Sequence, residues 1–228
     1  LRYLKPKFLY FKNIFFQSMP ISVSICGYAL AAAIIFTYVG QSGEYAVAGY
    51  GAGTRIEQVV LLPILGINTA IISIISQNFG ARNFNRIKET YFTAIKYAFI
   101  IMIISGTIVF ILAGFITSIF SNDPEVIEYG KRYLKISAFV LPAYPVFFLS
   151  NGFFMALKKS EYAMISNFFR NVLNPIIVFY LARYYGASFE TFFWIWVIIN
   201  WFFSISYLLF VIYYFNKKLN KSSAVVHP

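Results

Sequence analysis

Six long apolar stretches, separated by short polar breaks, limit what this chain can fold into. Each is longer than the roughly 20 residues that a helix needs to cross the hydrocarbon core of a bilayer. Hydrophobic residues make up 60% of the chain and charged residues 12%, whereas soluble domains carry about 25% charged residues. The sequence therefore predicts an all-α, polytopic membrane protein, a bundle of six transmembrane helices. The stretches are residues 13–39, 46–77, 91–120, 127–157, 161–182 and 191–215.

The domain organisation expected from these stretches has three parts. Residues 1–12 are basic and aromatic and form a cytoplasmic linker or lead-in, residues 13–215 form the six-helix transmembrane lobe, and residues 216–228 form a cytoplasmic tail. The first stretch is too long for the apolar core of a cleavable signal peptide. Because the sequence begins with Leu1 rather than Met, we expect a processed chain or part of a longer polypeptide.

The basic residues are divided unevenly between the two ends of the predicted bundle. An excess of Lys and Arg marks cytoplasmic loops, so we expect both termini in the cytoplasm of a bacterial cell and the helices in its inner membrane. The net charge of +11 is then a topology signal and does not indicate nucleic-acid binding. One side holds Arg2, Lys5, Lys7, Lys12, Arg82, Arg86, Lys88, Lys158, Lys159, Lys217, Lys218 and Lys221, and the other holds Lys131, Arg132, Lys135 and Arg183.

Three ionisable residues, Arg55, Glu57 and Arg170, lie well inside the predicted helices. Such residues are costly in a bilayer and are candidates for function. Glu57 could couple or gate transport, because a carboxyl group poised between neutral and charged forms suits proton coupling; the alternative is a structural ion pair. Helical geometry places Gln58 on the face of Arg55, and Asn68 on nearly the face of Glu57. We take these four residues of the second stretch as coupling or gating candidates.

The fifth stretch carries a row of polar side chains spaced i, i+3, i+4, i+7, which is one helical face. Lipid cannot satisfy their hydrogen bonds, so they must face protein or a wet cavity. They form either interhelical hydrogen bonds or the polar wall of a transport pathway or gate. Polar residues of the fourth stretch are their expected neighbours. The cavity-lining candidates are Tyr144, Ser150, Asn151, Asn167, Arg170, Asn171 and Asn174.

Proline and glycine inside the apolar stretches predict where helices bend or meet. A proline removes one backbone donor and kinks the helix that contains it. Gly49 and Gly53 form a pair of small residues that lets a second helix approach closely. The predicted bends are at Pro20, Pro63, Pro142 and Pro145.

Motifs typical of enzymes are missing from the sequence. It has no cluster of His, Cys and carboxylate residues at metal-ligand spacing, no glycine-rich phosphate loop and no nucleophile elbow. We therefore expect a non-enzymatic transporter without a metal or cofactor, for which uphill transport would have to use an ion gradient.

A family resemblance is specific over residues 46–89 and looser from about 13 to 215. Its pattern is a small-residue run, an arginine, a mid-helix proline, a glycine, an alanine and a Gln-x-x-Gly-Ala loop. These are Ala46–Ala52, Arg55, Pro63, Gly66, Ala70, Gln77, Gly80 and Ala81. In this pattern the chain resembles the multidrug and toxic compound extrusion (MATE) transporters.

The resemblance implies twelve helices in two six-helix lobes that exchange Na⁺ or H⁺ for organic cations by rocking between two states. This chain would be the C-terminal lobe, with the N-terminal lobe of the same polypeptide, or a homodimer partner, completing the transporter. Some family members carry acidic coupling residues on the first and fourth helices of this lobe, whereas residues 13–39 and 136–156 contain none. This departure favours coupling in the other lobe, with Glu57 as the embedded acid of this half.

The function expected from the sequence is that of a cation-coupled antiporter that exports lipophilic organic cations and contacts membrane lipid. One alternative is a flippase for lipid-linked saccharides from the same superfamily, which would need a basic cavity for pyrophosphate. Another is a non-transporting membrane assembly subunit.

Overall fold

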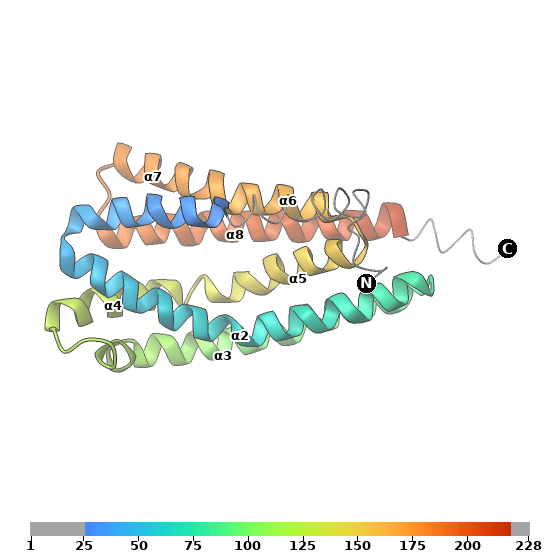
Figure 1. The fold of residues 1–228 in the computed structure, drawn as a ribbon, viewed down its shortest axis with the longest axis horizontal. Helices are drawn as coiled ribbons and strands as arrows, with labels where there is room; N and C mark the ends of the chain where they lie inside the picture. The colour runs from blue at the N-terminus through green and yellow to red at the C-terminus, as the bar shows by residue number, and fades with distance from the viewer. Residues whose placement is uncertain (1–25, 220–228) are drawn as a thin grey trace, which may run out of the picture.

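A computed structural model describes residues 26–219, and every element in this part of the chain is helical, which confirms the all-α prediction. Pro20, residues 1–12 and residues 220–228 lie outside the described residues. The first described helix covers residues 26–39. After it come η1 (Gly40–Ser42), α2 (Glu44–Gly80), α3 (Phe84–Ser118), α4 (Pro124–Ser137), η2 (Leu141–Ala143), α5 (Tyr144–Ala156), α6 (Ser160–Phe168), η3 (Phe169–Leu173), α7 (Asn174–Tyr184), α8 (Phe189–Tyr214) and η4 (Phe215–Leu219) (Figure 1).

These helices correspond to the apolar stretches of the sequence. By length and composition, α2, α3 and α8 could each cross a membrane, and α4 and α5 together could form a fourth span that is bent by 41°. The fifth stretch is built from α6, η3 and α7, which follow one another without a gap from Ser160 to Tyr184. The helices run along the long axis of the molecule and are joined by short connections at its two ends (Figure 1).

Polar caps mark where α3 and α4 begin. The side chain of Asn83 accepts a hydrogen bond from the Arg86 backbone N–H at the start of α3. At the start of α4, the side chain of Asp123 accepts a hydrogen bond from the Glu125 backbone N–H, and Pro124 takes the first helical position. Such caps satisfy backbone donors that have no partner inside the helix. They keep the polar connections short and at the ends of the bundle.

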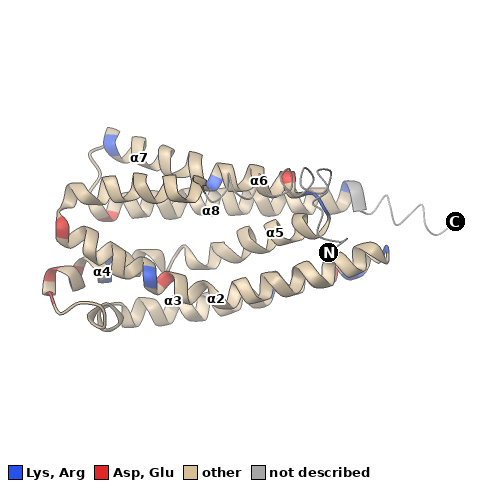
Figure 2. Cartoon of the chain, in the orientation of Figure 1, with Lys and Arg blue, Asp and Glu red and all other residues tan. Residues whose placement is uncertain are grey.

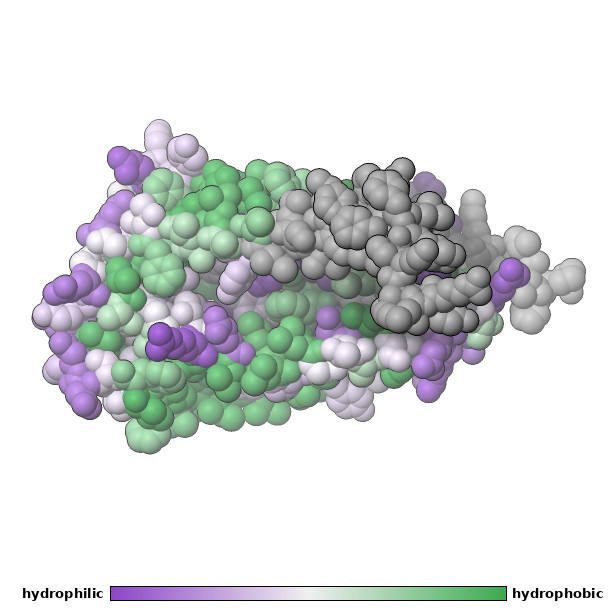
Figure 3. All heavy atoms as spheres, viewed as in Figure 1, coloured by the Kyte–Doolittle hydropathy of each residue, from purple (hydrophilic) through white to green (hydrophobic). Residues whose placement is uncertain are grey.

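The surface of the molecule has apolar and polar regions, just as the sequence has apolar stretches and polar breaks. Charged residues lie mostly toward the two ends of the molecule, with few between them (Figure 2). On the face shown in Figure 3, hydrophobic residues dominate the middle and hydrophilic residues gather at the left-hand end. An apolar middle between polar ends is the surface that a bilayer requires.

Within residues 26–219, the core consists of two aromatic-rich clusters. One contains Tyr38, Tyr133 and Phe192, with the Tyr38 and Phe192 rings stacked at a centroid distance of 4.2 Å. The other contains Tyr91 and Phe153. These clusters join α2, α3, α4, α5 and α8 into one bundle.

Close helix contact at the glycine pair is confirmed. A Cβ added to Gly49 would lie 2.7 Å from the backbone nitrogen of Gly130 and 2.7 Å from the carbonyl oxygen of Val126, both in α4. At Gly53 it would meet the ring of Tyr133. The two glycines therefore let α4 pack directly against the backbone of α2.

The prolines of the second and fourth stretches act differently. The helix of the fourth stretch ends at Ser137, and α5 begins only after η2, which contains Pro142; Pro145 then lies in the first turn of α5. By contrast, α2 continues through Pro63 from Glu44 to Gly80 and changes direction about midway along its length (Figure 1). One proline pair thus breaks a helix, whereas Pro63 lies within an unbroken one.

Candidate functional site

Glu57 lies where α2, α4 and α5 meet. The Tyr133 hydroxyl of α4 donates a hydrogen bond to Glu57 Oε2 at 2.5 Å, and the Tyr144 hydroxyl of α5 donates to Oε1 at 2.8 Å. Both tyrosines are buried and Glu57 is half-buried. Hydrogen bonds to a carboxylate are stronger than those between neutral groups. The three helices therefore hold one acid in a fixed orientation.

The Glu57 carboxylate lines a cavity of about 360 Å³. We call this space the Glu57 cavity. Its size falls in the lower part of the range of small-molecule sites. Aromatic rings and a few polar groups share its wall. Among the residues that line it are Tyr28, Tyr50, Thr54, Glu57, Gln58, Tyr133, Tyr144, Phe147, Phe148, Asn167, Arg170, Asn171, Phe193 and Trp196.

Arg170 in η3 is held against aromatic rings of α5. Its guanidinium carbon lies 4.1 Å from the Phe147 ring centroid, 4.7 Å from that of Tyr144 and 5.4 Å from that of Phe148. A cation within about 6 Å of a ring face is attracted to it. Tyr144 therefore links the two charged groups, since its hydroxyl contacts Glu57 while Arg170 lies over its ring.

The other coupling or gating candidates of the second stretch lie at different places in the structure. Gln58 lines the Glu57 cavity, as do Asn167 and Asn171 of the fifth stretch. Arg55 is exposed and is not among the residues that line this cavity.

The buried Asn68 Oδ1 has no hydrogen-bond partner among the described residues, and it lies where a side chain on Gly152 of α5 would be. Glu57 and Asn68 thus both face α5.

The polar residues of the fourth stretch have two different partners. Asn151 joins α8 to α6: its Oδ1 accepts a hydrogen bond from the Tyr207 hydroxyl at 3.0 Å, and its Nδ2 donates to Asn167 Oδ1 at 3.4 Å. The Ser150 hydroxyl instead pairs with the Tyr91 hydroxyl of α3 at 2.6 Å. Asn151 is therefore a neighbour of the polar row, as expected, whereas Ser150 faces the opposite helix.

The polar row of the fifth stretch is not one α-helical face, contrary to our expectation. Residues Phe169–Leu173 form a π-helical turn, and Asn174 begins α7 immediately before Pro175. Pro175 has no N–H to bond to the carbonyl four residues earlier, and its ring crowds that carbonyl. A π turn relieves this conflict by widening the helix. Asn174 is consequently fully buried and does not line the Glu57 cavity.

Tyr133 is the main site residue that the sequence analysis missed. The signal was present in the spacing of α2, because Gly49, Gly53 and Glu57 are four residues apart and share a face. The helix that packs against both glycines must also pass the carboxylate. A tyrosine of α4 near Gly130 was therefore the natural partner to expect.

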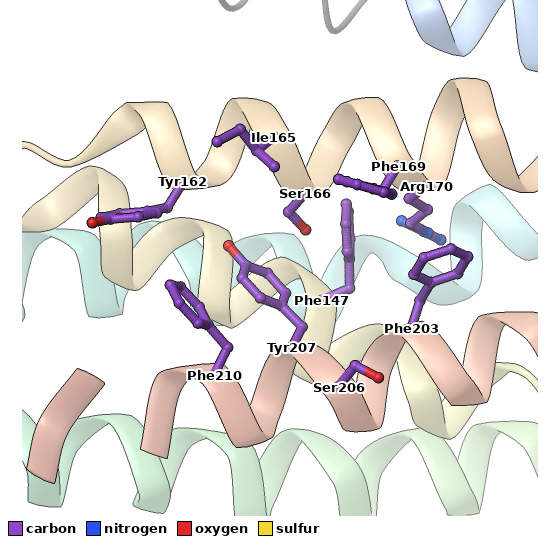
Figure 4. Close-up of a pocket in the computed structure, with 10 residues that line it drawn as sticks. All are labelled: Phe147, Tyr162, Ile165, Ser166, Phe169, Arg170, Phe203, Ser206, Tyr207 and Phe210. Atoms are coloured by element: carbon purple, nitrogen blue, oxygen red, sulfur yellow. The ribbon is translucent and has the colours of Figure 1, made fainter. Parts of the chain in front are cut away.

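A second cavity, of about 450 Å³, lies between α5, α6 and α8 (Figure 4). We call it the side cavity. Phe147 and Arg170 line both cavities. Among the described residues, no three His, Cys, Asp or Glu side chains are grouped as a metal site would require.

Comparisons with known proteins agree with the helical architecture. The model of the MatE family matches residues 20–180. The probable multidrug resistance protein YpnP of Bacillus subtilis is 25% identical over 150 residues, which are 66% of this chain and 32% of that protein. The multidrug export protein MepA of Staphylococcus haemolyticus is 24% identical over 187 residues, which are 82% of this chain and 41% of that protein.

A solved structure shows the same fold. A MOP superfamily transporter from Pyrococcus furiosus Vc1 superposes with a TM-score of 0.83 at 23% identity, over 92% of this chain and 48% of the other. The chain thus spans about half of that structure, and between about a third and two fifths of the two curated relatives.

Proposed function

Because this chain belongs to the MatE family of membrane transporters, we propose that it forms the C-terminal six-helix half of an antiporter. That antiporter would export lipophilic organic cations in exchange for Na⁺ or H⁺. Its membrane would be the bacterial cytoplasmic membrane, with both termini of this half inside.

The observation that carries the proposal is the Glu57 carboxylate, held by two tyrosine hydroxyls in the wall of an aromatic cavity. Na⁺, a proton and an organic cation can all bind a carboxylate. Ligands that compete for one group weaken each other's binding reciprocally, which is the thermodynamic basis of exchange. The surrounding rings would add cation–π attraction for a flat organic cation.

The charge balance of the cavity favours this proposal over a flippase for lipid-linked saccharides. A pyrophosphate group calls for several cationic donors. Of the described residues that line the Glu57 cavity, Arg170 is the single cation, and Glu57 opposes it. Arg55, the other deep arginine of the sequence, does not line this cavity.

The partner in this proposal is a second six-helix lobe. The P. furiosus transporter, of which this chain matches about half, supports that arrangement. We expect the native polypeptide purified from membranes to have about twice the mass of these 228 residues, as measured by intact mass spectrometry. A polypeptide of this length alone would instead require a homodimer.

The direct test replaces Glu57 by Gln in the full-length protein reconstituted in liposomes. We expect ion-gradient-driven transport of ethidium to fall about tenfold or more, because Gln keeps the shape but cannot carry the charge. Ethidium binding should stay measurable. Glu44→Gln, in the exposed first turn of the same helix, is the matched control and should transport normally. Normal uphill transport by the Glu57→Gln protein would exclude a coupling role for this acid.

A further inference from the structure

The side cavity has walls that suit a flat aromatic molecule. Rings from α6 and η3 face rings from α8, with one ring of α5 between them (Figure 4). Parallel and edge-on contacts between rings contribute beyond the burial of apolar area alone. A volume of about 450 Å³ lies within the usual range of small-molecule sites. The rings are Phe147, Tyr162, Phe169, Phe203, Tyr207 and Phe210.

The charge of the side cavity is opposite to that of an organic-cation site. Arg170 is the single charged residue among the described residues that line it, and no carboxylate lines it. The remaining polar groups are the hydroxyls of Tyr162, Ser166, Ser206 and Tyr207. A ligand with an acidic group would therefore find a partner here, whereas a cationic ligand would meet a like charge in a setting of low dielectric constant.

Arg170 is well placed to serve such a ligand. Its guanidinium lies over the Phe147 ring, and Figure 4 shows it beside Phe203 at one end of the cavity. Stacking uses the flat face of a guanidinium and leaves the N–H groups along its edge for polar partners, of which the Tyr144 hydroxyl is one. The fork of N–H groups matches an acidic group with two oxygens. Glu57, which Tyr144 links to Arg170, attracts the guanidinium from the other cavity. Among the salt bridges of the described residues, none joins Arg170 to a carboxylate.

We propose that the side cavity is a second binding site, which takes the aromatic part of a lipophilic acid and pairs its acidic group with Arg170. The site is separate from the Glu57 cavity and shares only Phe147 and Arg170 with it. A lipid acyl chain is the competing occupant, since Ile165, Phe169 and Phe210 at the rim are exposed. An acyl chain would make no use of the guanidinium, and charge complementarity therefore favours the aromatic acid.

Two fluorescent probes of nearly the same shape test the proposal. These are 1-anilinonaphthalene-8-sulfonate and N-phenyl-1-naphthylamine, which lacks the sulfonate. Binding would be measured to the full-length protein in phosphatidylcholine nanodiscs, with protein-free nanodiscs subtracted. We expect saturable binding of the sulfonate to be about tenfold or more tighter than that of the neutral probe, as a charge-assisted pair with Arg170 should provide.

Two variants locate the binding. Arg170→Gln should bring the affinities of the two probes to within about threefold of each other, because it removes the charge. Ser206→Phe should fill the cavity from α8 and abolish saturable binding of both probes. Ser206→Ala is its control, because it changes the same position without adding volume, and thermal unfolding would confirm that each variant is folded.

Three outcomes would overturn the proposal. The first is equal affinity of both probes for the unaltered protein, and the second is unchanged sulfonate binding in Ser206→Phe. The third is binding that appears in detergent but is absent in nanodiscs, which would assign the cavity to lipid chains. Probe binding needs no ion gradient. Failure of the antiport proposal would therefore not affect the probe-binding result. Failure of probe binding would likewise not affect the antiport proposal.

Discussion

At the scale of single residues, the molecule solves the problem of an acid inside a membrane by giving each carboxylate oxygen its own donor. Tyr133 and Tyr144 come from different helices, so the Glu57 carboxylate also links α4 to α5. A buried charge without such partners would cost several kcal/mol. The tyrosine hydroxyls therefore serve stability and site geometry together.

A double-mutant cycle measures this link. Tyr133→Phe keeps the ring but removes one hydrogen bond to the carboxylate, so we expect a loss of about 1.5–3 kcal/mol in unfolding free energy. In the Glu57→Gln background the same change should cost less, leaving a coupling energy of about 1 kcal/mol or more. Chemical denaturation in detergent would measure it. Tyr28→Phe, at an exposed position of the same cavity, is the control, and strict additivity at Tyr133 would contradict the link.

A site residue could be predicted from the sequence where its signal lay in its own stretch. Glu57 and Arg170 stand out because charge is rare in an apolar stretch. Tyr133 does not, since tyrosine is frequent throughout this chain and its role depends on a contact between α2 and α4. The misplacement of Asn174 has another cause: the predicted α-helical spacing runs through Phe169–Leu173, where the backbone forms a π turn ahead of Pro175.

At the scale of helices, irregularities lie next to the candidate site. The break between α4 and α5 precedes Tyr144, and the π turn contains Arg170. A regular helix would present these side chains at a fixed 3.6-residue spacing. Broken and widened turns change that spacing and aim both residues at one cavity. The proline bends could be foreseen from sequence, but the direction of the side chains beyond them could not.

The contact between α2 and α4 gives a prediction at this scale. Gly49→Ala would place a methyl group against backbone atoms of Val126 and Gly130, which cannot move aside as a side chain can. We expect a loss of about 1–3 kcal/mol from overpacking, seen as a lower midpoint in thermal unfolding. Gly51→Ala, on the same helix with open space around the added methyl group, should be neutral or slightly stabilising. Equal midpoints would show that the close contact is not rigid.

At the scale of the whole molecule, the bilayer makes the fold predictable, because six stretches of spanning length leave few alternatives to a helical bundle. The cavities were not predictable in this way. Their walls come from residues far apart in sequence, such as Glu57, Tyr144 and Phe193, and helical periodicity does not say which helices become neighbours. The pairing of helices therefore had to come from the structure.

The two ends of the bundle predict its orientation in the membrane. One end holds the connections at 40–43, 119–123 and 185–188, and the other holds those at 81–83 and 157–159 (Figure 1). Arg82, Lys158 and Lys159 belong to the second end, and such an excess of positive charge is retained in the cytoplasm.

Cysteine labelling tests this orientation in the full-length protein with its native cysteines replaced. We expect a membrane-impermeant maleimide applied to intact cells to label Asn122→Cys, because exposed Asn122 lies in the acidic connection before α4. Lys159→Cys, before α6, should be labelled only after the cells are permeabilised. The Lys159 side chain forms an exposed ion pair with Glu161, and a cysteine keeps the backbone hydrogen bonds of this position, so the replacement should not disturb the fold. Labelling of Lys159→Cys from outside would reverse the orientation.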